Sequence, residues 1–222
     1  MVQQKNIGGV ECVAIGDPDA ALQVVLLHGR MMSGEDLAPF GQSLGIPAYF
    51  VFPSAPLAVA PHGRSWWPVD CELEAARRQA GPLDLYALWP EGRAQARATL
   101  GALLSALPPV RKRVLGGFSQ GGMLAMDYVL QGAPAPSLLA LLSSSRIAFD
   151  DWLPRLSRLQ GLPMLVAHGR DDLELAFSAG EALRDAAVAG GAAVEWLPFD
   201  GGHGIPLVVW RALRRRALQL ID

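Results

Sequence analysis

The sequence has few cysteines, no dominant sign of charge and no long apolar segment. Cys12 and Cys71 stand far apart without metal-like spacing, so we expect free thiols. The net charge of −2 makes nucleic acid an unexpected partner. No apolar run reaches the roughly 18–20 residues that span a bilayer, and residues 1–9 lack the pattern of a secretion signal. We therefore expect a cytoplasmic protein without stable membrane insertion.

Apolar residues make up 51% of the 222 residues, enough for one domain spanning residues 1–222 to bury a core. Short apolar runs alternate with segments of helical periodicity, which predicts an α/β fold with a mostly parallel sheet and helices on both faces. The expected strands are Val10–Ile15 at an edge, Val24–Leu27, Tyr49–Phe52, Val114–Phe118, Leu138–Leu142, Met164–Ala167 and Val194–Leu197. The expected helices are Glu35–Leu44, Glu91–Leu107, Gly122–Gln131, Ala176–Ala189 and Pro206–Leu220.

One long connection, from Pro53 to Pro90, interrupts this alternation and contains six prolines. Connections of this length usually carry function, so we expect this 53–90 insertion to form a wall of the substrate site in place of a large cap. Packing in the core is the alternative role for its two adjacent tryptophans. The candidate pocket residues, here and in neighbouring loops, are Met31, Met32, Leu57, Trp66, Trp67 and Leu207.

The strongest local signal is Gly117-Phe118-Ser119-Gln120-Gly121, directly after an expected strand and directly before a helix. A serine on so sharp a turn needs glycine neighbours, because Cβ atoms would collide there. The turn exposes the hydroxyl and places the amide of Gln120 beside it, where developing negative charge is favoured. We interpret Ser119 as a nucleophile; an ordinary glycine-rich turn is the alternative.

A serine hydroxyl needs a base within hydrogen-bond reach, and the chain offers four histidines. His203 lies in a glycine loop between the last expected strand and the last helix, so its ring could reach over the sheet. His28 and His168 each end a buried strand and are expected to brace loop backbone. His62, in the insertion, is expected at the surface. His203 is therefore the predicted base.

The base in turn needs a carboxylate that orients it and stabilises the imidazolium. Asp171 and Asp172 both follow the strand that ends near His168, and spacing alone does not separate them. Asp150 and Asp200 are rivals that we expect to be exposed to solvent. Either of the first pair gives the chain order nucleophile, acid, base, which is the order of α/β-hydrolases.

An oxyanion hole needs a second backbone donor, which such folds place in the loop after an early strand. Gly29 permits close approach there, and the N–H of Arg30 is the natural donor beside that of Gln120. The Arg30 side chain either packs against an acidic loop residue or contacts a polar part of the substrate.

Four ordered motifs resemble the phospholipase/carboxylesterase family, which includes acyl-protein thioesterases and small bacterial carboxylesterases. They are L-L-H-G-R at 26–30, G-F-S-Q-G-G at 117–122, H-G-R-D-D at 168–172 and G-G-H-G at 201–204. The resemblance spans nearly the whole chain and implies a single-domain α/β-hydrolase without metal or cofactor. Some members are dimers, so it also allows a homodimer. In the family pattern H-G-x-x-D the acid is the last residue, which favours Asp172 over Asp171, and the second oxyanion amide maps onto Arg30.

The chain departs from this family pattern in two loops. Met31 stands where many members have glycine, and Glu174-Leu175-Ala176 replaces a Val-Val-Pro ending. We expect both loops to differ in shape, although no catalytic group is lost.

These observations predict a serine carboxylesterase that hydrolyses short-to-medium acyl esters through an acyl-enzyme, with a small-molecule ester as its partner. One alternative is an acyl-protein thioesterase or lysophospholipase that acts on long acyl chains. Another, from a different class, is a catalytically silent hydrolase-fold binding protein.

Overall fold

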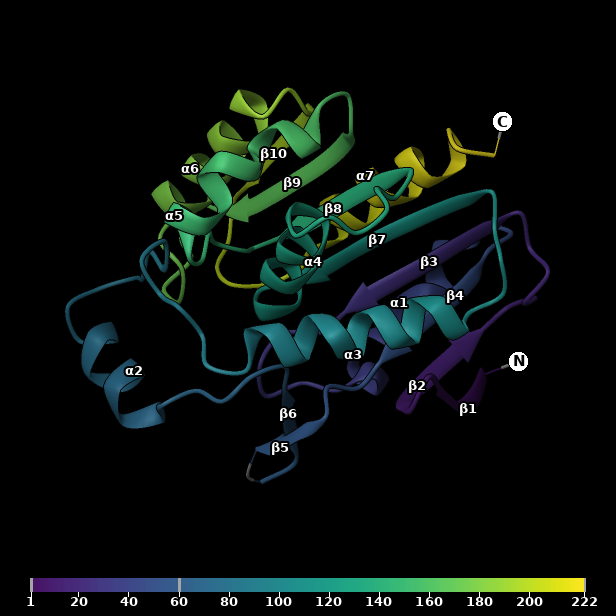
Figure 1. The fold of residues 1–222 in the computed structure, drawn as a ribbon, viewed down its shortest axis with the longest axis horizontal. Coiled ribbons are helices and arrows are strands. Elements are labelled where there is room, and N and C mark those ends of the chain that lie inside the picture. The colour runs from purple at the N-terminus through teal and green to yellow at the C-terminus, as the bar shows by residue number, and fades with distance from the viewer. Residues whose placement is uncertain (1, 60, 222) are drawn as a thin grey trace.

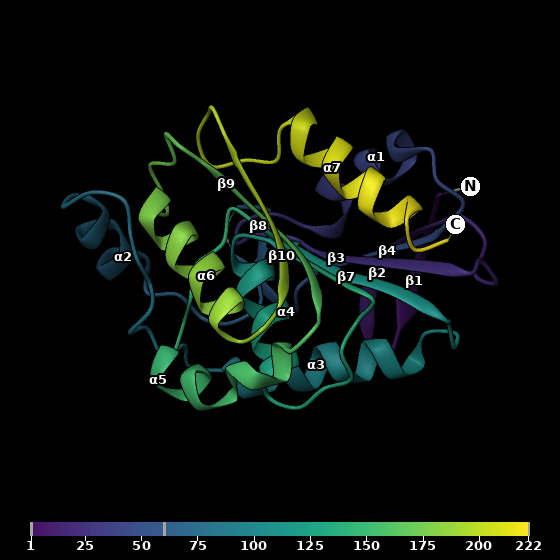
Figure 2. The ribbon, with the colours of Figure 1, turned by 90° about the horizontal axis from the view of Figure 1, so that it is seen from above.

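The computed structural model describes residues 2–59 and 61–221, apart from the side chains of Cys71, Glu74, Arg77 and Arg78. Eight strands form one sheet in the order β1-β2-β4-β3-β7-β8-β9-β10. The strands β4, β3, β7, β8, β9 and β10 run parallel to one another. β1 and β2 are antiparallel to their neighbours. Helices cover both faces of the sheet (Figures 1 and 2). The α/β prediction is confirmed.

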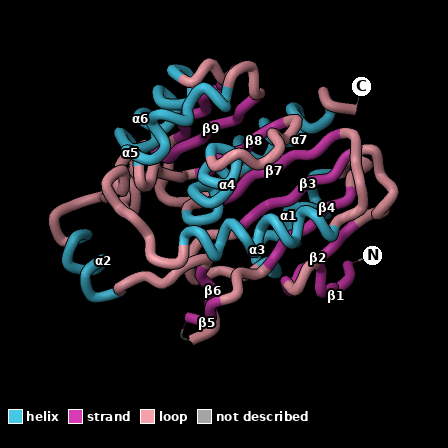
Figure 3. Tube along the Cα trace, viewed as in Figure 1, coloured by secondary structure: helices cyan, strands magenta, loops and turns pink. Residues whose placement is uncertain are grey.

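The strands of the sheet are β1 (Val2–Ile7), β2 (Val10–Ile15), β3 (Leu22–Leu27), β4 (Tyr49–Pro53), β7 (Lys112–Phe118), β8 (Leu138–Leu142), β9 (Pro163–Gly169) and β10 (Ala193–Phe199). A separate hairpin pairs β5 (Leu57–Val59) with β6 (Gly63–Ser65). The helices are α1 (Gly34–Leu44), α2 (Cys71–Arg78), α3 (Arg93–Ala106), α4 (Gln120–Leu130), α5 (Phe149–Trp152), α6 (Phe177–Ala189) and α7 (Leu207–Leu218). A 3-10 helix at Leu153–Leu159 continues α5. Figure 3 shows how these helices flank the strands.

The central strands are apolar on both faces because each face carries its own core. In β8, Leu139 and Leu141 belong to the core shared with α3, α4 and α6. Leu138 and Leu142 belong to the core shared with α1 and α7. Each fully buried leucine contributes about 1.5–3 kcal/mol of transfer free energy, so the sheet is fixed from both sides.

The expectation that Val10–Ile15 is an edge strand is wrong, because β1 pairs outside it. β1 reads VQQKNI, is mostly exposed and lacks an apolar pattern, as an edge strand that resists aggregation often does. The 53–90 insertion also contains elements that the pattern did not predict. Four of the eight residues of α2 are charged, and β5 and β6 have three residues each, so none of these elements contains an apolar run as long as those of the sheet.

The carboxyl ends of the parallel strands meet at one edge of the sheet, where such folds place their ligand sites. The loops after β3, β7, β9 and β10 all leave from this edge, and α2 lies beyond it (Figure 1). These loops carry the predicted site residues. Within the described part of the chain, no helix combines the length and the apolar character needed to cross a bilayer.

Candidate active site

Ser119 connects β7 to α4 in a strained conformation, with φ 50° and ψ −118°. A positive φ costs an L-residue about 1–2 kcal/mol, so the surroundings must enforce it. A Cβ on Gly117 would lie 2.3 Å from the carbonyl carbon of Gly121, and a Cβ on Gly121 would lie 2.3 Å from the carbonyl oxygen of Leu27. The turn closes only because both positions lack side chains. The sharp strand-to-helix turn predicted from the motif is confirmed.

The side chain of Gln120 is buried and holds the 53–90 insertion in place. Its oxygen accepts a hydrogen bond from the Trp66 N–H at 2.9 Å, and its nitrogen donates to Ser65 Oγ at 3.0 Å. The Gln120 backbone N–H lies in the first turn of α4, where N–H groups have no partner within the helix. Sequence reasoning used only this backbone N–H. No local pattern revealed these side-chain contacts, because the partners are separated by 54 and 55 positions in the sequence.

His203 lies in the loop after β10, as the sequence predicted. Its Nδ1 is 2.7 Å from Asp172 Oδ2, and its ring centroid is 4.7 Å from that of Phe118. His203 and Ser119 line the same pocket, although no hydrogen bond between these two side chains occurs among the described residues. Catalytic hydrogen bonds are often long without substrate and tighten in the complex. The structure therefore brings the two groups to one site.

Asp172 is buried, and both of its oxygens are used. Oδ1 accepts hydrogen bonds from the N–H groups of Glu174 and Leu175 at 2.8 and 2.9 Å. Oδ2 lies 2.7 Å from His203 Nδ1 and 3.3 Å from His168 Nε2. Burial by itself raises the pKa of Asp172, but the hydrogen bonds from His168 and His203 outweigh it and hold that pKa well below its usual range. The carboxylate facing His203 is therefore ionised at neutral pH.

The rival aspartates do not reach His203. Asp171 is exposed, and its N–H donates to the carbonyl oxygen of Gly201 at 3.0 Å. The Asp200 side chain is 97% exposed beside Arg170, and Asp150 is exposed as well. The geometry thus separates Asp172 from Asp171, which spacing alone did not.

The other histidines lie where the sequence placed them, with one addition. The His28 ring is buried between the Gly29 carbonyl oxygen, 2.7 Å from Nδ1, and the Ala55 N–H, 2.9 Å from Nε2. His168 Nε2 lies 3.1 Å from the carbonyl oxygen of Leu175. Both rings brace loop backbone, and His62 is exposed. Sequence reasoning missed the contact of His168 with Asp172, for which their separation of four residues at the end of β9 was the available signal.

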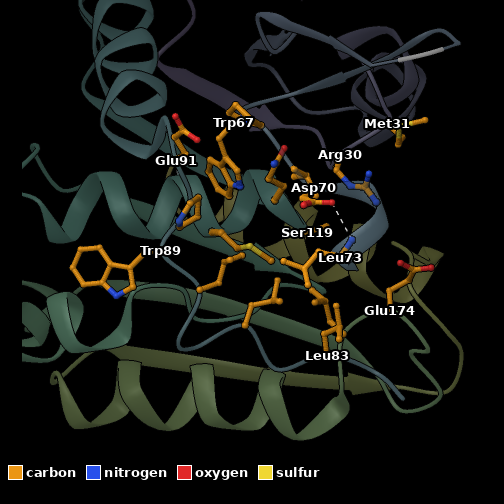
Figure 4. A pocket seen from close by; sticks show the side chains of 18 of the residues that line it. Arg30, Met31, Trp67, Asp70, Leu73, Leu83, Trp89, Glu91, Ser119 and Glu174 are labelled. Carbon is orange, nitrogen blue, oxygen red and sulfur yellow. Dashed lines mark hydrogen bonds between the residues drawn. The ribbon is translucent and has the colours of Figure 1, made fainter. Parts of the chain in front are cut away.

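The loop after β3 passes close to Ser119. A Cβ on Gly29 would lie 3.3 Å from Ser119 Cβ, so this glycine permits the approach. Arg30 lines the pocket (Figure 4). Met31 adopts φ 68°, and its N–H donates to the carbonyl oxygen of Arg64 at 2.9 Å. Met31 therefore keeps the left-handed conformation that glycine favours, although its side chain is large.

Known proteins resemble this chain in structure more than in sequence. Its sequence matches no family model and no curated protein. Esterase PE8 is 24% identical with a TM-score of 0.75, and the match covers 100% of this chain and 99% of that one. Acyl-protein thioesterase 2 from Zea mays is 20% identical with a TM-score of 0.76, over 95% and 99% of the two chains. A phospholipase/carboxylesterase from Dyadobacter fermentans is 16% identical with a TM-score of 0.66, over 98% and 99%.

The chain has the α/β-hydrolase fold. Its neighbours in structure come from the group of proteins that the four sequence motifs resemble. Identities below 25% extend this likeness to the fold and no further, so the chemistry depends on the site itself.

The site opens into a pocket of about 820 Å³. The 53–90 insertion forms one wall of it, as predicted, with apolar side chains that include Trp67, Val69, Leu73, Leu83, Leu85, Leu88 and Trp89. Phe118, Met123 and Leu175 complete the apolar lining, and Asp70, Glu91 and Glu174 add carboxylates (Figure 4). The described residues include no cluster of side chains suited to hold a metal ion.

Of the six candidate pocket residues, Met31 and Trp67 line the pocket. Trp66 does not, because its ring packs 5.3 Å from His28 and its Nε1–H donates to the His28 carbonyl oxygen at 2.9 Å. Of the two adjacent tryptophans, one therefore belongs to the core and one to the pocket.

Met32, Leu57 and Leu207 also lie away from this pocket. Met32 packs against the core under α1 and α7. Leu57 is exposed on the β5–β6 hairpin, and Leu207 is 61% exposed at the start of α7. The sequence suggested these three because they are apolar and lie in the insertion or near the motifs, but this does not report which way each side chain points.

Proposed function

We propose that this α/β-hydrolase is a serine carboxylesterase with Ser119 as nucleophile, His203 as base and Asp172 as acid. The observation that carries this proposal is the convergence of three groups at the carboxyl edge of the sheet. Ser119 occupies a strained turn, His203 shares its pocket, and a buried carboxylate lies 2.7 Å from His203 Nδ1. This arrangement activates a serine hydroxyl for acyl transfer.

In the proposed mechanism, Ser119 Oγ attacks the ester carbonyl carbon while His203 Nε2 removes the hydroxyl proton. Asp172 accepts the hydrogen bond from Nδ1–H and stabilises the imidazolium that forms. The backbone N–H groups of Arg30 and Gln120 donate to the oxyanion, and each such donor contributes about 2.7–4 kcal/mol. The C–O bond then breaks, and the alcohol leaves with the proton from His203. Water repeats the sequence on the acyl-enzyme and releases the acid.

The apolar wall formed by the 53–90 insertion supports a substrate with an apolar acyl group. We propose short-to-medium acyl esters. The likeness to an acyl-protein thioesterase from Zea mays keeps a thioesterase for long acyl chains as the second candidate. Turnover of p-nitrophenyl esters from C2 to C16, beside acyl thioesters of the same lengths, separates the two. A maximum at C12–C16, or faster thioester hydrolysis, would replace the first proposal by the second.

The nucleophile is tested with Ser119→Ala and a fluorophosphonate probe. We expect kcat to fall by about four to six orders of magnitude and labelling to disappear. Ser137→Ala is the control, because it also removes a serine hydroxyl, but at the opposite end of β8 and away from the pocket. Ordinary turnover by the Ser119 variant would disprove the mechanism. A wild-type protein that resists the probe would instead support a silent binding protein.

A further inference from the structure

Ser143, the first residue after β8, is completely buried and has φ 44°. Its N–H donates to the carbonyl oxygen of Ala167 at 2.8 Å. Its hydroxyl donates to the carbonyl oxygen of Gly204 at 3.0 Å. Glycine would adopt this φ without strain, but glycine has no hydroxyl. Strain kept next to an active site calls for a functional explanation, and the hydroxyl is what distinguishes serine here.

The acceptor of this bond directly follows His203 in a loop that contains three glycines. Such a loop has high conformational freedom unless other segments restrain it. Two bonds from other loops restrain it on either side of His203. The Gly201 carbonyl oxygen accepts from the Asp171 N–H at 3.0 Å, and the Gly204 carbonyl oxygen accepts from Ser143 Oγ. His203 therefore lies between a hydrogen bond to the loop that carries Asp172 and a hydrogen bond to the residue at the end of β8.

The end of β8 is a suitable anchor because β8 lies between the strands that carry the nucleophile and the acid. Leu142 is in register with Phe118 of β7 and with Ala167 of β9. Its carbonyl oxygen also accepts the Ser119 N–H at 2.9 Å. A hydroxyl on the next residue is thus fixed relative to both partners of His203.

We propose that Ser143 is a positioning residue that sets the orientation of the His203 imidazole through the Gly204 carbonyl. This inference rests on the proposed function, in which His203 transfers the proton of Ser119. Loss of the Ser143 hydroxyl leaves the pocket wall unchanged but allows the loop that carries His203 to move. A displacement of the base by about 1 Å can lower the rate about a hundredfold. Loss of one hydrogen bond should displace the His203 ring by less than this, so we expect kcat to fall about tenfold.

The test compares Ser143→Gly and Ser143→Ala with the control Ser137→Ala. Glycine fits φ 44° and removes the hydroxyl alone, so the Ser143→Gly variant should fold even where the alanine variant is destabilised. The Ser137 hydroxyl accepts the Arg113 N–H at 3.2 Å at the other end of the same strand. We expect both Ser143 variants to lower kcat and the rate of fluorophosphonate labelling about tenfold, with KM within about twofold of wild type. The control should keep both rates.

A folded Ser143→Gly variant with wild-type kcat and labelling rate would overturn the proposal, because the hydroxyl would then serve folding alone. A loss that appears in KM instead of kcat would overturn it too. These outcomes differ from a failure of the proposed function, in which the wild-type protein itself resists the probe or Ser119→Ala keeps its activity.

Discussion

Acid is expected to destabilise this protein through His28, whose ring is fully buried. Its Nδ1 faces the Gly29 carbonyl oxygen at 2.7 Å and its Nε2 faces the Ala55 N–H at 2.9 Å. Only the neutral ring with its proton on Nδ1 satisfies both neighbours, because a proton on Nε2 would face another N–H. Burial accordingly lowers the pKa of His28 from 6.5 to about 4, against the smaller opposing effect of the Gly29 hydrogen bond.

The size of the effect follows from this pKa difference. Between pH 6.5 and about 4 the unfolded chain binds a proton at His28 that the folded protein does not, so the free energy of unfolding decreases as the pH falls. The stabilisation is fully present above pH 6.5 and is lost progressively towards the folded pKa of about 4. A gap of about 2.5 pH units corresponds to about 3 kcal/mol, of which about 2 kcal/mol is lost between pH 7 and pH 4.5.

Urea unfolding at pH 7 and pH 4.5 measures this loss in the wild type and in His28→Gln. The glutamine side chain offers an acceptor to the Ala55 N–H but does not titrate. We expect the variant to be less stable at pH 7, by about 1 kcal/mol, because the bond to Gly29 is lost. Because only the wild type loses about 2 kcal/mol on going to pH 4.5, the order should reverse there, with the variant more stable by about 1 kcal/mol, since all other titrating groups cancel in the comparison.

Equal losses of stability in the two proteins between pH 7 and pH 4.5 would refute this reasoning. The comparison requires that the dependence of the free energy on urea concentration be the same in both, because a changed slope signals a changed denatured state. A loss confined to the wild type assigns the acid sensitivity to His28.

Two further predictions concern the site. Asp172→Asn should lower kcat about 10⁴-fold, because an amide no longer stabilises the imidazolium of His203, whereas the exposed neighbour variant Asp171→Asn should stay near wild type; equal losses in steady-state assays would contradict the assignment. Trp89→Ala should raise KM for apolar esters about fivefold at unchanged kcat, since Trp89 lines the pocket and is 59% exposed. An unchanged KM would place the substrate elsewhere in the pocket.

The sheet could be predicted where burial on both faces left an unambiguous apolar run. β8 was predicted with its exact bounds, Leu138–Leu142, because all five residues are buried between two cores. β1 could not be predicted, because an exposed edge strand is polar and carries no such pattern. The turn at Ser119 was also predictable, since Gly117 and Gly121 are required by contacts within a few residues or with the adjacent strand.

The pocket was less predictable, because its lining depends on contacts between distant segments. Trp66 and Trp67 are adjacent and chemically identical, yet one packs on His28 and the other lines the pocket. The Gln120 side chain fixes this arrangement, because its oxygen accepts a 2.9 Å hydrogen bond from the backbone N–H of Trp66, which is 54 positions away in the sequence. Local patterns carry no information about such a contact.

The loop after β3 shows how tertiary contacts override a local preference. Glycine is favoured at φ 68°, and Met31 holds this conformation at a cost of about 1–2 kcal/mol. The β5–β6 hairpin offsets that cost through two backbone bonds, from the Met31 N–H to the Arg64 carbonyl oxygen at 2.9 Å and from the Arg64 N–H to the Met32 carbonyl oxygen at 3.0 Å. Gly63 makes the contact feasible, since a Cβ there would lie 2.5 Å from Met31 Cα. The hairpin, not the residue type at position 31, therefore fixes the backbone of this loop next to Arg30.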